Sequence, residues 1–205
     1  MRILKSLLIS SLLVETAFAA QLAMHSGLLQ WSQAKTIKSP NHRFRIEVHP
    51  ILTDAENHSP VVVRALADHR TLRLFTLTRS AQAEWSPDSQ RILIIDQPTS
   101  DRYYIRLFTT DGKSVGADSD NMVRSEVIKM IGPERTTEFY LPTFVSWNRN
   151  EVLLAVGGTS SRGINKPMEP YCFGVRIDDV SGKVLNTFSK DALKQEFNST
   201  CRTST

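Results

Sequence analysis

Hydrophobic and polar residues alternate along several short segments of this 205-residue chain. In the segment FRIEV at 44–48, apolar residues alternate with Arg45 and Glu47. A period of two is typical of a β-strand with one buried face. Residues 92–95 form an uninterrupted apolar run, ILII, which also predicts a strand. The pattern therefore predicts a mainly β protein.

Three segments share a turn followed by a strand. They are IKSPNHRFRIEV at 37–48, AEWSPDSQRILIID at 83–96 and a degraded copy, FVSWNRNEVLLAVGG, at 144–158. In the first two, proline presets φ in the turn and short polar side chains bond the local backbone. In the third copy, Asn148, Arg149 and Asn150 occupy the turn without a proline. Such internal similarity predicts a fold of repeated units.

Each copy is followed by a second strand pattern and a tight turn. The second strands lie within 60–75, 102–115 and 172–185, and they place Arg64, Arg106 and Arg176 at comparable points. The tight turns that follow are expected at 68–70, 111–113 and 181–183, two of which contain a glycine that supplies positive φ. The repeating unit is thus strand, loop, strand, turn and strand.

Three segments have the spacing of helices. Residues 120–131 carry apolar side chains at helical intervals after a polar segment, 118–120, that can cap a helix. Ser189 can cap a second helix over 190–197. We also expect helical structure in 21–35.

The segment WSPDSQRILI at 85–94 resembles the Ser-Pro-Asp-Gly-Lys motif of WD-repeat-like blades in periplasmic Tol-system propellers and in the propeller domains of some exported peptidases. The resemblance implies antiparallel propeller-like sheets, here in three recognisable blade units with two or three short helices. It also implies binding through loops around a central channel. Closed propellers need about four to eight blades. A divergent fourth blade, completion by another chain and a non-propeller layered β fold therefore all stay open.

The first 19 residues have the pattern of a secretory signal peptide. Arg2 and Lys5 precede a short apolar run, and Ala17 and Ala19 are the small residues that a signal peptidase reads. We therefore expect a periplasmic or secreted protein, with residues 20–205 as a single domain. The alternative is an uncleaved N-terminal anchor. No later segment has the ~18 apolar residues that a membrane span needs.

Cys172 and Cys201 are the only two cysteines. An oxidising compartment allows an even pair to form one bridge, so we expect a Cys172–Cys201 disulfide. Two free thiols or a metal pair are the alternatives. The metal pair has no histidine partner at ligand spacing near either cysteine.

The sequence contains no set of residues that predicts catalysis. The segment 157–162 has Arg162 where a nucleophile elbow needs its last glycine, and the Ser-x-x-Lys pattern at 32–35 lacks its partner motifs. The formal charge of +4 is spread along the chain, without a basic helix, so a nucleic-acid partner is not expected. We expect neither a metal nor a cofactor.

Binding is the function that remains, through a protein or peptide held by loops on a β-sheet scaffold. Arg64, Arg106 and Arg176 either converge on an anionic ligand or face solvent separately. Loop 159–171 is long for a hairpin and is a common kind of binding element; its candidate contacts are Arg162, Lys166 and Tyr171.

Two alternatives to this binding module stay open. One is an envelope hydrolase or small-ligand-binding protein, whose site would combine His42, His49 and His58 with Asp54. The other is a homo-oligomer in which strand edges pair to complete a ring.

Overall fold

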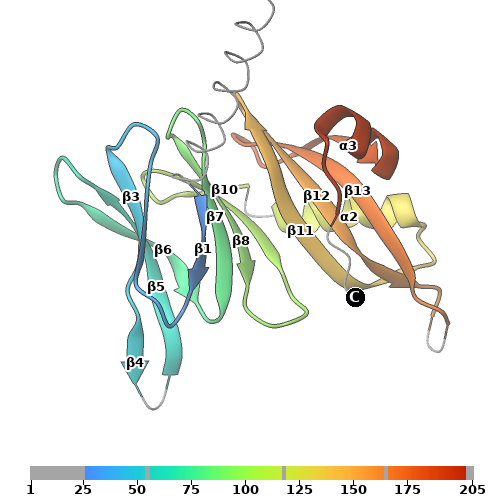
Figure 1. Ribbon diagram of the computed structural model, residues 1–205, viewed down its shortest axis with the longest axis horizontal. Coiled ribbons are helices and arrows are strands. Elements are labelled where there is room, and N and C mark those ends of the chain that lie inside the picture. The colour runs from blue at the N-terminus through green and yellow to red at the C-terminus, as the bar shows by residue number, and fades with distance from the viewer. Residues whose placement is uncertain (1–25, 54–55, 117–118, 164–165, 202–205) are drawn as a thin grey trace, which may run out of the picture.

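Three antiparallel sheets and two helices make up the computed structural model, which describes residues 26–53, 56–116, 119–163 and 166–201 (Figure 1). The first sheet has the strand order β2 (Lys35–Lys38), β3 (Phe44–Val48), β5 (Glu56–Ala65) and β6 (Thr71–Leu77), with β4 (Ile51–Thr53) paired to the start of β5. The second has the order β1 (Ser26–Gln30), β7 (Ser80–Trp85), β8 (Arg91–Gln97), β9 (Tyr104–Thr109) and β10 (Ser114–Val115). The third has the order β11 (Thr136–Asn148), β12 (Glu151–Ser161), β13 (Glu169–Asp178) and β14 (Val184–Ser189).

The second sheet lies between the other two and is buried on both faces. Ile92 and Ile94 pack in one apolar cluster with residues of the first sheet, while Leu93 and Ile95 pack in another with residues of the third. Successive side chains of a strand point to opposite faces, so an apolar run of four serves both clusters at once. The run at 92–95 therefore marks the middle layer.

The turns before β3 and β8 have the same geometry. Ser86 Oγ accepts hydrogen bonds from the amides of Gln90 (3.1 Å) and Arg91 (2.8 Å) and donates one to Asp88. Ser39 Oγ likewise accepts from the amide five residues on, that of Phe44 (3.1 Å). The two turns also touch, because the Asn41 amide donates to Ser89 Oγ (3.0 Å). This contact links the two turns across the boundary between the first two sheets.

The third turn is different. Asn148 and Glu151 pair directly, so Arg149 and Asn150 form a two-residue hairpin between β11 and β12. Arg149 adopts a left-handed φ of 51° there. The degraded third copy of the repeat therefore keeps the strand but replaces the serine-centred turn.

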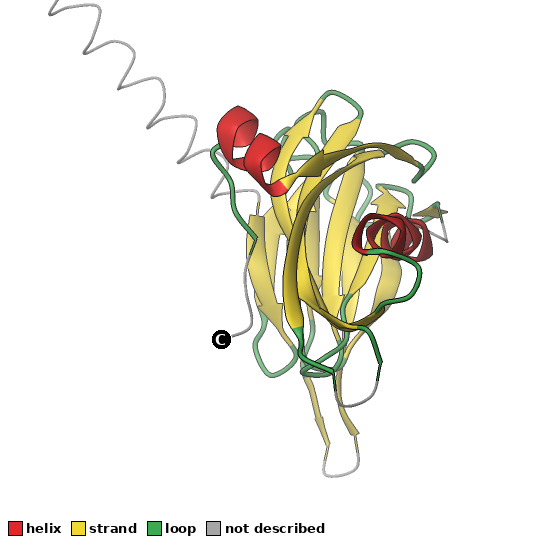
Figure 2. Cartoon of the chain, turned by 90° about the vertical axis from the view of Figure 1, so that its right-hand side faces the viewer, coloured by secondary structure: helices red, strands yellow, loops and turns green. Residues whose placement is uncertain are grey.

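Two helices flank the third sheet (Figure 2). Helix α2 (Ser119–Ile131) contacts β9 of the second sheet and β13 and β14 of the third, and buries Val123 and Val127. Helix α3 (Lys190–Phe197) begins at Ser189, whose side chain accepts from the Ala192 amide, and packs Leu193 on the far face of the third sheet. Both predicted helices are confirmed.

A disulfide joins Cys172 on β13 to Cys201, just beyond α3. Gly174 lies on the same strand, where a Cβ would come within 3.0 Å of Leu193 and Phe188. A side chain at 174 would therefore push the helix away from the sheet. The predicted pairing of the two cysteines is confirmed, and it anchors the helix that covers this face.

The expectation of a mainly β chain with antiparallel sheets is confirmed, and that of a helix over 21–35 is wrong for its described part. Residues 26–30 form β1, which pairs with β7 along its whole length and buries Leu29. Edge pairing overrides the local helical spacing here because it satisfies backbone groups and buries an apolar side chain together.

The three sheets do not form a closed ring among the described residues. The segment 1–19, where the sequence predicts a signal peptide, lies outside these residues, and no described helix is long and apolar enough to cross a membrane.

Ser86→Ala should lower the free energy of unfolding by about 1–3 kcal/mol, because it removes the buried hydroxyl that accepts hydrogen bonds from the Gln90 and Arg91 amides. Ser100→Ala, at an exposed position of the β8–β9 loop, is the control and should change little. Urea unfolding followed by circular dichroism measures both. Equal stabilities for the two variants would show that the turn does not depend on the serine.

Candidate functional site

The outer face of the first sheet is the face that points away from the second sheet. Ile46 and Val63 belong to the apolar cluster between the two sheets, so their neighbours in the strand point the other way. The residues of this outer face are Thr36, Lys38, Arg45, Glu47, Val62, Arg64, Thr71 and Arg73.

Strand register brings three cations into one row of the outer face. Lys38 on β2 pairs with Arg45 on β3, and Arg45 pairs with Arg64 on β5. Directly opposed side chains on neighbouring strands lie about 5 Å apart, and like charges there repel. Arg73 on β6 belongs to the adjacent row, opposite Val62.

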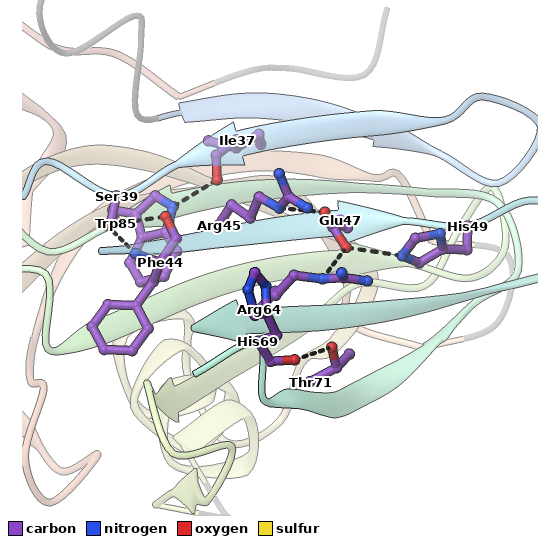
Figure 3. Close-up of polar contacts among 10 residues, drawn as sticks. All are labelled: Ile37, Ser39, Phe44, Arg45, Glu47, His49, Arg64, His69, Thr71 and Trp85. Carbon is purple, nitrogen blue, oxygen red and sulfur yellow. Dashed lines mark hydrogen bonds and ion pairs between the residues drawn. The ribbon is translucent and has the colours of Figure 1, made fainter. Parts of the chain in front are cut away.

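The carboxylate of Glu47 offsets the repulsion between the opposed Arg45 and Arg64 side chains. It is only 6% exposed, and it forms ion pairs with Arg45 and with Arg64, whose Nε lies 3.1 Å from Oε2 (Figure 3). His49 Nε2 lies 3.1 Å from the same Oε2. One buried carboxylate therefore contacts Arg45 of β3, His49 just after β3 and Arg64 of β5.

The outer face keeps a surplus of positive charge. Among the eight residues named above for this face, Lys38, Arg45, Arg64 and Arg73 are cationic and Glu47 is the one carboxylate. Lys38 and Arg73 are exposed, and the two central arginine side chains remain 34% and 30% exposed. Their guanidinium groups are thus held in place by Glu47 and still reach solvent.

The position of the second sheet that corresponds to Glu47 in the repeat is apolar. Glu47 follows Ser39 by the same number of residues as Ile94 follows Ser86. Ile94 is fully buried against the first sheet, whereas no described element covers Glu47 in the same way. A terminal unit of a stacked array needs a polar outer face for this reason.

Arg64, Arg106 and Arg176 do not converge. Arg64 lies on the outer face of the first sheet. Arg106 lies between the first two sheets, paired with Asp96 (3.0 Å) and stacked over Phe75. Arg176 lies on the far side of the third sheet, over Phe188 near α3. Each is held within its own layer, so the three cannot contact one small anion together.

The loop between β12 and β13 is shorter than expected and loses one of its candidates. Both strands extend into the predicted loop, to Ser161 and back to Glu169. Tyr171 is buried on β13, where its hydroxyl donates to the carbonyl of Phe139 (2.7 Å) and burial raises its pKa well above 10. Tyr171 therefore packs the core. Arg162 and Lys166 are exposed, as a loop binding site requires.

The histidine site gains little from the structure. His42 takes a left-handed φ of 57° in the turn before β3, and His49 contacts Glu47. Asp54 and the side chain of His58 lie outside the described residues. Within the described part of the chain, no group of three His, Cys, Asp or Glu residues is placed to hold a metal ion.

Four charged residues of the outer face were not among the binding residues predicted from the sequence. They are Lys38, Arg45, Glu47 and Arg73. The alternation in 44–48 does place Arg45 and Glu47 on one face of a strand. What the sequence does not give is the cross-strand register, which decides that Lys38, Arg45 and Arg64 share a row.

Comparisons with protein families, with curated proteins and with solved structures gave no match. What this chain does must therefore follow from its own residues, and the outer face of the first sheet is their most distinctive arrangement.

Glu47→Gln should lower the free energy of unfolding by about 1–3 kcal/mol, because the opposed Arg45 and Arg64 lose their shared counter-charge. The loss should shrink in 0.5 M NaCl, since salt screens the remaining repulsion. Urea unfolding at two salt concentrations measures the effect, with Glu196→Gln on the exposed side of α3 as the control. A loss that is independent of salt would point to lost packing instead of charge repulsion.

Proposed function

We propose that this chain is an exported binding module and that the outer face of the first sheet binds an acidic segment of a protein partner. The observation that carries the proposal is the row of Lys38, Arg45 and Arg64 around the buried Glu47. Its excess positive charge is held on rigid strands, and such pre-organisation lowers the cost of binding. Arginine also matches a carboxylate with two parallel hydrogen bonds.

An extended acidic segment fits the spacing of this face. Neighbouring strands lie about 4.8 Å apart, and alternate residues of an extended peptide lie about 6.6 Å apart on one side. Long lysine and arginine side chains bridge that difference, so alternate Asp or Glu residues of the partner can each meet one cation of the row. A flat sheet face suits such a segment better than it suits a small molecule, which needs a concave site.

The outward faces of the first and third sheets, which end the stack, favour a module that acts without closing into a ring. We infer an open stack of three propeller-type antiparallel sheets, in which most paired strands are also neighbours in the sequence. The charges of Arg45 and Glu47 disfavour apolar packing on the first sheet, and α3 covers the last one. Completion of the ring by further copies of the chain would need both surfaces to be free and apolar.

The disulfide supports export. Cys172 of β13 is bonded to Cys201, and such bonds persist in oxidising compartments. This agrees with the expected signal peptide, so the partner is expected in the periplasm or outside the cell.

The direct test is binding of a labelled peptide of alternating Glu and Thr residues to mature 20–205, measured by fluorescence anisotropy. Lys38→Glu with Arg73→Glu should weaken binding at least tenfold, because both are exposed cations beside the central arginine pair and the change reverses their charge. Lys190→Glu with Lys194→Glu, on exposed positions of α3, makes the same change in net charge and is the matched control.

Equal losses in the two double variants would show that only net charge matters and would contradict a specific face. Binding that is equally strong for a sulfated oligosaccharide would also contradict recognition of a protein segment. A mature chain that forms stable rings in sedimentation would favour the homo-oligomer over the open module.

A further inference from the structure

A cleft of about 380 Å³ opens between the second and third sheets, on the side of β1. Its described lining comes from β1, β7 and β8, from the loop before β9 and from β11, and it includes Leu28, Ser80, Gln82, Glu84, Ile95 and Pro142. The cleft lies on a different layer boundary from the cationic outer face, so it is a separate site.

The position of α2 explains why the space is open on this side. Helix α2 contacts β9, β13 and β14, and its Val123 and Val127 fill the gap between the two sheets at those strands. No described helix fills the side of β1 and β11 in the same way. The two sheets therefore leave an unfilled wedge where Pro142 of β11 faces β7 and β8.

A polar row on β7 lines this wedge. Ala81, Ala83 and Trp85 point into the core shared with the first sheet, so Ser80, Gln82 and Glu84 point toward the third. The Ser80 hydroxyl donates to Gln97 Oε1 (3.1 Å), and Gln82 Nε2 donates to Glu84 Oε1 (2.9 Å). Three polar side chains are thus fixed along one wall of a partly apolar cleft.

Among the described residues, none supplies a counter-charge to Glu84 in this wedge. It is 6% exposed, and Gln82 is its one hydrogen-bond partner among the described residues. The groups that face it are uncharged: Leu28 from β1, Ile95 and Gln97 from β8, Tyr103 and Pro142. Burial raises the pKa of Glu84 to about 7, and the bond from Gln82 offsets only part of that rise.

We propose that the cleft binds a small organic ammonium ion, with the ammonium group on the Glu84 carboxylate and the alkyl portion against Leu28, Ile95 and Pro142. An ammonium supplies both the missing counter-charge and hydrogen-bond donors for Oε2, which Gln82 leaves free. The cleft volume is in the range of small-molecule sites, and its walls combine apolar side chains with a few fixed polar groups, as such sites do. A buried carboxylate of shifted pKa in a cleft is itself typical of a functional site.

Binding of a cation must displace the proton of Glu84. With a pKa of about 7 in the free protein, the carboxyl is mostly protonated at pH 6 and mostly ionised at pH 8. The affinity for an ammonium should therefore rise about tenfold from pH 6 to pH 8. Close to one proton should be released per ligand at pH 6, and almost none at pH 8.5.

The experiment uses mature 20–205 and pentylammonium chloride as the probe. Isothermal titration in two buffers of different ionisation enthalpy, at pH 6 and at pH 8.5, counts the protons released. Glu84→Gln should abolish both the proton release and the pH dependence and weaken binding at pH 8.5 at least tenfold. Glu196→Gln, an exposed carboxylate on α3, should leave all three unchanged.

Leu28→Trp provides a second variant that leaves Glu84 intact. Leu28 is 54% exposed on the edge strand β1, so a larger ring there can fill the mouth of the cleft without disturbing the core. This variant should lose pentylammonium binding while the acidic-peptide binding of the outer face persists. Affinity that does not change with pH, or pentanol that binds as tightly as pentylammonium, would overturn the proposal.

Discussion

The rest of the structure depends on the burial of the second sheet on both of its faces. Ile92, Leu93 and Ile94 are fully buried on one strand, and they alternate between two apolar clusters. Full burial of such a side chain contributes about 1.5–3 kcal/mol. The first and third sheets pack on opposite faces of this layer, so its burial decides which of their faces point outward.

The first and third sheets each have one face that no further sheet covers among the described residues. The two faces differ in how they avoid exposing an apolar surface. The third sheet is covered by α3, which the Cys172–Cys201 disulfide anchors. The first sheet instead exposes charges, with Glu47 buried among arginines where the second sheet has Ile94. The requirement for a polar end thus also concentrates cations on one rigid face, which is why the proposed binding surface lies there.

Much of the architecture could be predicted from the sequence because its signals are local. Local contacts determine the turns at Ser39 and Ser86 and the start of the helix after Ser189. Each depends on residues no more than five positions apart in the sequence. The features that escaped prediction are non-local. Pairing with β7 makes residues 26–30 a strand, register places Lys38 beside Arg45, and the divergence of two sheets leaves Glu84 in a cleft. Alternation at 80–85 does separate Glu84 from the alanines, but it cannot tell a wedge from open solvent.

The double burial of the second sheet is tested most directly by native-state hydrogen exchange of residues 20–205, measured for each amide. The amides of β8 should exchange slowest in the molecule, through global unfolding, because both neighbouring sheets must separate before this strand opens. The amides of β3 and β12 should exchange faster, since each lies in an outer layer. Exchange in β8 that is as fast as in β3 would contradict a middle layer that holds the two outer sheets together.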